Sequence, residues 1–256
     1  MRIQTDSPLA THFCPSPNHG ARKAGCALDC IILHYTGMPT GADALARLCD
    51  EATQVSSHYF IDESGKVLQL VPEARRAWHA GASRWKGESD LNSSSIGIEI
   101  VNPGHDGGLP PFPAAQIEAV IELCRDIAER RAIAPERILA HSDIAPGRKI
   151  DPGENFPWDR LSAAGVGLWT EPAPIVDGLT FGPGSRGPDV SDLRRDLARY
   201  GYDIAPGDDY DAATSTVVAA FQLHFRPARV DGLADFSTRE TLRKLLAALY
   251  SAAAAV

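Results

Sequence analysis

Two histidines, an aspartate and a lysine are the residues of this chain whose types and spacing could carry out chemistry. His34 follows an apolar run, and His141 begins a Pro- and Gly-containing loop that passes through Lys149 to Asp151. Two imidazoles and one carboxylate are a usual ligand set for catalytic zinc, because they leave the fourth tetrahedral position open. The spacing matches no compact metal-binding motif, however. On the residues alone, each histidine could equally be a hydrogen-bonded core residue.

A glutamate and the lysine extend this chemistry. Glu99 is the one acid in an aliphatic segment, 95–101, and a buried carboxylate needs either a partner or a function. It could form a buried salt bridge, or it could deprotonate a water whose pKa zinc has lowered. Lys149 could be a solvated surface charge, or it could stabilise an oxyanion. A metal, a base and an oxyanion donor together predict hydrolysis of an amide bond.

The elements that must position these residues follow from the hydrophobic pattern. Continuous or alternating apolar residues predict strands over 30–36, 55–61, 66–71, 96–101 and 137–141. Helices are expected over 43–49 and over 113–131, where apolar residues recur at three- and four-residue steps. Strands interleaved with helices predict an α/β (α+β) fold, with a mixed central sheet flanked by helices.

Composition divides the chain into four segments. Residues 1–25 are rich in Pro, Ser, Asn and Gly and are expected to form an N-terminal arm, followed by a catalytic domain over 26–170. The Pro-containing stretch 171–178 predicts a linker. Three helical patterns, 190–200, 212–225 and 237–249, predict a second small three-helix domain over 179–256.

Charge and cysteine usage exclude several function classes. The 256-residue chain has a formal net charge of -8 and no basic stripe, which argues against a nucleic-acid partner. No segment approaches the roughly 18 apolar residues of a membrane span, so membrane insertion is not expected. The sequence shows no secretory signal pattern, and its five scattered cysteines are expected to be reduced thiols. Both features predict a cytoplasmic protein, with a periplasmic or extracellular location as the alternative. No obligate protein partner is evident.

An ordered series of short motifs runs through residues 28–170. The motifs are LHYT (33–36), VSSHYFI (55–61), LVPE (70–73), AWHAG (77–81), SIGIE (95–99), HSDIAPGRK (141–149), DPG (151–153) and FPW (156–158). In these segments the chain resembles the zinc-dependent N-acetylmuramoyl-L-alanine amidases of the amidase-2 type, which are related to the peptidoglycan recognition proteins. Within that group it is most similar to the AmiD and AmpD types.

The resemblance implies a role for each of the residues named so far. It implies one zinc ion per chain, bound by His34, His141 and Asp151. It also implies that Glu99 is the catalytic acid/base and that Lys149 stabilises the transition state. Tyr59 and His79 fall on family positions near the cleft and are expected to bind substrate. His58 is not expected to be a ligand, because alternation along a strand places it opposite to Tyr59.

The C-terminal segment resembles a second family, the peptidoglycan-binding type 1 domain. The similarity rests on turn residues and on one Phe-Gln pair: Gly201, Phe221, Gln222, Asp231 and Gly232. Most of the apolar positions in this segment are expected to be helix core. The resemblance implies a three-helix module.

Together the two resemblances imply an enzyme of peptidoglycan breakdown. The expected reaction cleaves the amide between N-acetylmuramic acid, including its 1,6-anhydro form, and L-alanine of muropeptides or peptidoglycan, in cell-wall recycling. The alternatives are an exported amidase acting on intact peptidoglycan and a recognition module that binds muropeptides without cutting them. One departure concerns stretch 88–92, which carries an acid where relatives often have an arginine; contacts to the carboxylates of the stem peptide are therefore not assigned to this stretch, and Arg84 or Lys86 could substitute.

Overall fold

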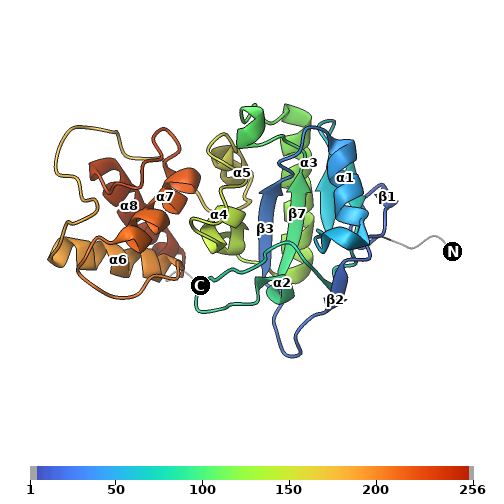
Figure 1. Ribbon diagram of the computed structural model, residues 1–256, viewed down its shortest axis with the longest axis horizontal. Helices are drawn as coiled ribbons and strands as arrows, with labels where there is room; N and C mark the ends of the chain where they lie inside the picture. The colour runs from blue at the N-terminus through green and yellow to red at the C-terminus, as the bar shows by residue number, and fades with distance from the viewer. Residues whose placement is uncertain (1–4, 254–256) are drawn as a thin grey trace.

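The computed structural model describes residues 5–253, so residues 1–4 and 254–256 of the predicted terminal segments lie outside the described residues. A six-stranded mixed sheet, with strand order β1-β5-β4-β7-β3-β8, forms the centre of the larger part of the molecule (Figure 1). A two-stranded antiparallel ribbon, β2-β6, lies beside it. The strands are β1 (His12–Phe13), β2 (His19–Ala21), β3 (Cys30–Tyr35), β4 (Tyr59–Ile61), β5 (Val67–Gln69), β6 (Arg75–Ala77), β7 (Ser95–Ile100) and β8 (Ile138–Ala140).

Helices cover both faces of this sheet and build a separate group at one end of the molecule (Figure 1). The α-helices are α1 (Gly41–Cys49), α2 (Leu91–Ser94), α3 (Ala114–Arg131), α4 (His141–Ile144), α5 (Trp158–Ala163), α6 (Pro188–Tyr200), α7 (Ala212–Phe225) and α8 (Phe236–Ala253). Three short 3-10 helices are η1 (Glu51–Thr53), η2 (His105–Gly107) and η3 (Pro135–Arg137). The prediction of a mixed sheet flanked by helices is confirmed.

The two faces of the sheet have different coverings. On one face, alternate residues of β3 and β7 pack with the apolar side of α3 and with α5 in one core. On the other face, α1 covers β4 and β5 through Leu48 and Phe60. The same face of β3 and β8 contributes Ile32 and Leu139 to a second core, which continues through Ile144 of α4 into the C-terminal helices. The part of this face between α1 and the C-terminal helices is where the ends of β3 and β7 meet a cavity, described below.

The three helices α6, α7 and α8 are the ones expected from the sequence. Asp211 caps α7 by accepting a hydrogen bond from the Thr214 amide. The helices pack around Leu197, Val218 and Leu245, and this core continues into residues of β3 and β8. The apolar packing is continuous between the sheet and the C-terminal helices, so it does not mark where one domain ends and the next begins. The domain boundaries at 1–25, 26–170, 171–178 and 179–256 remain a prediction.

Some predicted elements differ from the observed ones. The strand expected over 55–61 begins only at Tyr59, because the amides of Ser56 and His58 bond to Trp78 and Gly97 in an irregular segment. In the described residues, the N-terminal arm contributes β1 and β2 to the two sheets. All five cysteines are free thiols. None of the helices in residues 5–253 is both long enough and apolar enough to cross a membrane.

Candidate active site

Strand register brings the first two candidate residues together. His34 and Glu99 are direct partners in the parallel pairing of β3 with β7, so their side chains leave the same face of the sheet. β8 pairs with the other edge of β3 and ends at Ala140, so His141 follows at the start of α4 beside His34. The loop after α4 returns Asp151 to the same point, where the Ser142 amide donates to the Asp151 carbonyl.

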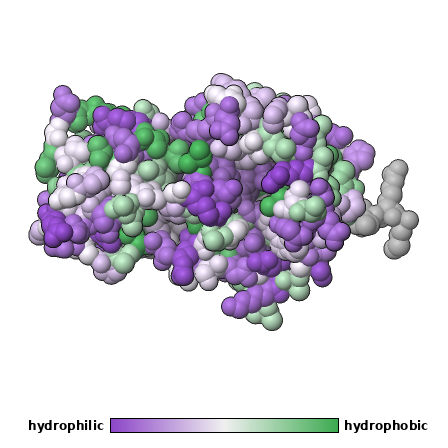
Figure 2. All heavy atoms as spheres, in the orientation of Figure 1, coloured by the Kyte–Doolittle hydropathy of each residue, from purple (hydrophilic) through white to green (hydrophobic). Residues whose placement is uncertain are grey.

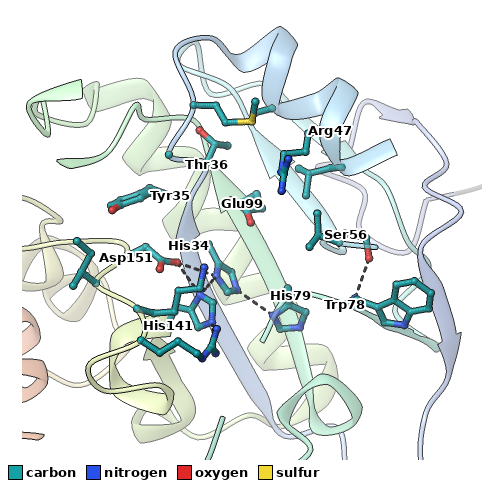
Figure 3. Close-up of a pocket in the computed structure, with 18 residues that line it drawn as sticks. His34, Tyr35, Thr36, Arg47, Ser56, Trp78, His79, Glu99, His141 and Asp151 are labelled. Carbon is teal, nitrogen blue, oxygen red and sulfur yellow. Dashed lines mark hydrogen bonds and ion pairs between the residues drawn. The ribbon is translucent and has the colours of Figure 1, made fainter. Parts of the chain in front are cut away.

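The three predicted metal ligands converge on one point. Nδ1 of His34 lies 2.9 Å from Nδ1 of His141, and each nitrogen lies 3.0 Å from Oδ2 of Asp151 (Figure 3). All three side chains are buried. Two ligand atoms at about 2.1 Å from a tetrahedral ion are about 3.4 Å apart, so this triangle needs only a slight opening to hold zinc.

Contacts on the far side of each ring orient the two imidazoles. Nε2 of His141 lies 3.1 Å from the carbonyl oxygen of Ala80, which can only accept, and a proton on Nε2 leaves the lone pair of Nδ1 facing Asp151 and His34. Nε2 of His34 contacts Nδ1 of His79 at 3.0 Å, and Nε2 of His79 contacts the Ser95 hydroxyl at 3.2 Å. Outer hydrogen bonds of this kind orient metal-ligating histidines.

The charge states of the site also suit a cation. Burial and the neighbouring His141 lower the pKa of His34 to about 4, so its imidazole is neutral at pH 7. Burial opposes ionisation of Asp151, but His141 and His34 outweigh it and lower the pKa of that carboxyl. The Nδ1 atoms of His34 and His141 and one carboxylate oxygen of Asp151 thus face each other at about 3 Å, a set of donors that a metal ion satisfies. The donor set therefore fits a metal.

Glu99 stands at the floor of the cavity beside this triangle (Figure 3). Its Oε2 is buried and has no hydrogen-bond partner among the described residues. Burial, and then the negative charge of Asp151, raise the pKa of Glu99 to about 8, an effect that Lys149 only partly offsets. An unpartnered carboxyl with a pKa near neutrality can both accept and return a proton.

The cavity itself has a volume of about 410 Å³ and is bounded by the metal triangle, α1 and the loop before Asp151. Lys149 lies on its wall, within the loop that carries Asp151. Arg47 from α1 and Arg148 also line it, whereas Arg84 and Lys86, the possible substitutes named above, do not. Arg84 instead forms an ion pair with Asp203. Figure 2 shows a hollow lined largely by hydrophilic side chains near the middle of this face of the molecule.

His79 lines the cavity, and its contacts show that it supports the neighbouring His34. Its ring packs against Gly97 of β7, where an added Cβ would lie 2.4 Å from the ring, so a side chain at that position would displace the ring. Its backbone amide and that of Ala80 both donate to the side-chain oxygen of Asn92, at 2.9 and 2.8 Å. Segment 79–80 thus supports both histidine ligands, His34 through a ring nitrogen and His141 through a carbonyl.

The expectation that Tyr59 lies near the cleft is wrong. Tyr59 pairs with Ile98 and faces the side of the sheet that α3 covers, opposite to the face that carries His34 and Glu99. It is fully buried, and its hydroxyl donates to Oε1 of Glu73 at 2.7 Å. His58 is not a ligand in this geometry either, since its Nε2 contacts the carbonyl oxygen of Arg75.

Sequence reasoning missed the role of Arg148. Its guanidinium donates to the carbonyl oxygens of Ala80 and Ala82, at 2.6 and 2.9 Å, and joins the loop of Lys149 to the segment that supports the histidines. Its position beside Lys149 in the motif was the available signal. The support that Ala80 gives to His141 comes from its backbone carbonyl, so the side chain of Ala80 gave no indication of it in the sequence.

Comparison with known proteins assigns this site to a family. Residues 24–154 match the N-acetylmuramoyl-L-alanine amidase family, and residues 186–242 match a peptidoglycan binding domain. Over 242 residues the chain is 41% identical to N-acetylmuramoyl-L-alanine amidase AmiD of Escherichia coli, which covers 88% of this chain and 85% of AmiD. The chain belongs to the N-acetylmuramoyl-L-alanine amidase family.

Solved structures of amidases extend the likeness over both parts of the chain. The structure of Escherichia coli AmiD in complex with anhydro-N-acetylmuramic acid-L-Ala-D-gamma-Glu-L-Lys matches with a TM-score of 0.72 at 40% identity, covering 88% of this chain and 92% of AmiD. AmpDh3 of Pseudomonas aeruginosa, in complex with an anhydromuramic pentapeptide, matches with a TM-score of 0.68 at 31% identity, covering 90% of this chain and 96% of AmpDh3. The family assignment makes this chain an amide hydrolase and confirms the resemblance seen in the sequence.

Proposed function

We propose that this amidase is zinc-dependent and that it cleaves the amide between N-acetylmuramic acid and L-alanine with Glu99 as its acid/base. The observation that carries the proposal is the convergence of three candidate ligand atoms beside Glu99, which pairs with His34 across the strands and whose buried Oε2 has no partner among the described residues. His34, His141 and Asp151 are the ligands. A bound zinc ion supplies a Lewis acid and lowers the pKa of water to near 7.

The residues around the ion divide the proton transfers and the charge stabilisation. Glu99 takes a proton from the attacking water and returns it to the departing amine of L-alanine. The Lys149 ammonium, on the cavity wall, donates a hydrogen bond to the oxygen of the former carbonyl as that oxygen gains negative charge. Arg148 holds the loop that carries Lys149, and His79 holds His34.

The substrate class that we propose is the anhydro-muropeptide, in cell-wall recycling. This proposal is supported by the anhydromuramyl ligands named for AmiD and AmpDh3. Arg47 from α1 points toward the cavity and gives it a positive rim where a carboxylate of the stem peptide can bind (Figure 3). The negatively charged stretch 88–92 lines no part of this cavity.

A product assay tests the substrate class. Zinc-loaded protein is offered 1,6-anhydroMurNAc-tripeptide and intact sacculi in parallel, and released peptides are identified by mass spectrometry. We expect rapid release of the tripeptide from the anhydro compound and little from sacculi. Equal release from both would favour the second candidate, an amidase of intact peptidoglycan, which the match of residues 186–242 to a peptidoglycan binding domain supports. No release from either, with muropeptide binding retained in Glu99→Ala, would favour the recognition module.

The cytoplasm stays the predicted compartment, and cell fractionation with an antibody against the native protein tests it.

A further inference from the structure

The C-terminal helices reach the turn that carries the ligand His141. Asp143 lies two residues further along α4 and is completely buried. Its Oδ1 accepts a hydrogen bond from the Tyr202 hydroxyl at 2.7 Å, and its Oδ2 accepts one from Nδ1 of His224 at 2.7 Å. Both donors belong to the C-terminal part of the chain, just after α6 and on α7. The third donor to Asp143 is the amide of Ala140, at 2.9 Å, directly before the ligand.

The packing around His224 leaves this imidazole little freedom. Its ring stacks on Trp158 of α5 and on Phe225, with centroids 3.8 Å apart in each case. Nε2 of His224 is buried and has no hydrogen-bond partner among residues 5–253, so Asp143 holds the polar side of the ring alone. The C-terminal helix α7 is thereby connected to α4 by a hydrogen bond and to α5 by stacked rings.

A movement of α4 would displace two of the three proposed ligands, His141 and Asp151. His141 is its first residue, and the amide of Ser142 donates to the carbonyl oxygen of Asp151 at 3.0 Å. The following loop also presses against α7. Gly147 has a φ of +74°, and an added Cβ there would lie 2.6 Å from a methyl carbon of Thr216. Lys149 follows two residues later.

A second anchor lies further from the site. Trp85 is fully buried with its ring edge-on to Tyr200 and Tyr202, at centroid distances of 5.2 and 5.1 Å. The amide of Lys86 donates to the carbonyl oxygen of Gly201 at 2.8 Å. In Figure 1, α4 and α5 lie between the sheet and the C-terminal helices. The C-terminal helices are thus packed against the metal-binding part of the sheet domain.

We propose that the C-terminal helical domain positions the metal site of this amidase, with Tyr202 and His224 acting as positioning residues through Asp143. This role differs from the binding of peptidoglycan, and it rests on the proposed zinc site at His34, His141 and Asp151. A buried carboxylate that loses a hydrogen-bond donor must either gain another donor or change its position. Because Asp143 sits in the same short helix as His141, such a shift moves a ligand. Partners beyond the ligands typically change metal affinity by about 10- to 100-fold.

The test uses two matched tyrosines of the same full-length protein. Tyr202 and Tyr210 are both buried, and each donates one hydrogen bond of 2.7 Å, Tyr202 to Asp143 and Tyr210 to the carbonyl oxygen of Gly232. Tyr202→Phe and Tyr210→Phe therefore remove the same group from the same domain. His224→Phe, which can still stack on Trp158, removes the second donor to Asp143.

Zinc affinity is the first readout, measured on the metal-free proteins by competition with a chromogenic chelator. We expect the zinc Kd to rise about tenfold in Tyr202→Phe and in His224→Phe, and to stay at the wild-type value in Tyr210→Phe. At saturating zinc, we expect the first two variants to lower kcat and leave KM unchanged. Urea unfolding identifies any general loss of stability, which both tyrosine variants should show equally.

Two results separate this inference from the proposed function. If wild-type protein binds zinc and releases peptide, but Tyr202→Phe and Tyr210→Phe have the same zinc Kd and kcat, the positioning role is refuted and the zinc amidase stands. If the wild-type protein binds no zinc at the three ligands, with His141→Ala as the reference, the proposed function itself is refuted.

Discussion

Replacing Glu99 with glutamine should reduce catalysis and, in the metal-free protein, increase stability. Glu99 is partly buried on β7, and its Oε2 is buried and has no hydrogen-bond partner among the described residues. Glutamine has nearly the same shape but cannot ionise, so Glu99→Gln removes the cost of burying a charge. The same substitution removes the group that we propose as the acid/base.

The magnitude of the stability change follows from the pKa. Burial, and then Asp151, raise the pKa of Glu99 from 4.5 to about 8. A carboxyl with a raised pKa in the folded state stabilises the fold fully below pH 4.5, and this contribution is lost as the pH rises toward 8. By linkage, ionisation lowers the free energy of unfolding by about 1 kcal/mol at pH 5 and by about 3 kcal/mol at pH 7.

The assay is urea unfolding of the metal-free wild type and Glu99→Gln at pH 5 and pH 7. Other titrating groups are common to both proteins, so their effects cancel in the difference. We expect the stability advantage of Glu99→Gln to widen by about 2 kcal/mol between the two pH values. A difference that stays constant with pH would refute the reasoning, because it would mean that Glu99 is not a buried carboxyl of raised pKa.

Activity of the zinc-loaded proteins completes this test. We expect Glu99→Gln to lower kcat by about 10²- to 10⁴-fold, the usual contribution of a general acid/base. Glu122→Gln, at an exposed position of α3, is the matched control and should retain wild-type kcat.

Three further predictions concern the other site residues. Lys149→Met should lower kcat about 10²- to 10³-fold with zinc retained, since one oxyanion donor is lost; steady-state kinetics beside Lys66→Met, an exposed lysine, check this, and an unchanged kcat would exclude the role. His141→Ala should lose stoichiometric zinc on dialysis because only two ligands remain, and metal analysis that still finds one zinc per chain would place the ion elsewhere. Tyr59→Phe should lower the free energy of unfolding by about 1 kcal/mol and leave KM unchanged, because its hydroxyl bonds to Glu73 in the core; a raised KM would restore it as a substrate contact.

The convergence of His34, His141 and Asp151 beside Glu99 could be predicted from the sequence because each residue belongs to a recognisable pattern. His34 follows the apolar run 30–33 in β3, and Glu99 interrupts the aliphatic residues of β7. Both patterns therefore indicate a polar group on a buried face of the sheet. The ordered motifs of the family then place His141 and Asp151 in the same predicted site as His34 and Glu99. Parallel pairing of β3 with β7 placed His34 opposite Glu99, as a shared site requires.

The position of Tyr59 could not be read in the same way. Alternation separates Tyr59 from Phe60, but both faces of this sheet are buried, so the pattern does not say which face holds the cavity. The contact between α4 and the C-terminal helices was also beyond the sequence. Asp143, Tyr202 and His224 lie far apart in the chain, and no periodicity connects them.

The most direct test of the central claim is a zinc titration of the metal-free protein with peptide release followed in the same samples. We expect release of L-alanyl peptide from 1,6-anhydroMurNAc-tripeptide to rise linearly and to reach its plateau at one zinc per chain, and to stay at background in His141→Ala. Full activity in the metal-free wild type, or a plateau that His141→Ala reaches equally, would contradict a zinc amidase centred on His34, His141 and Asp151.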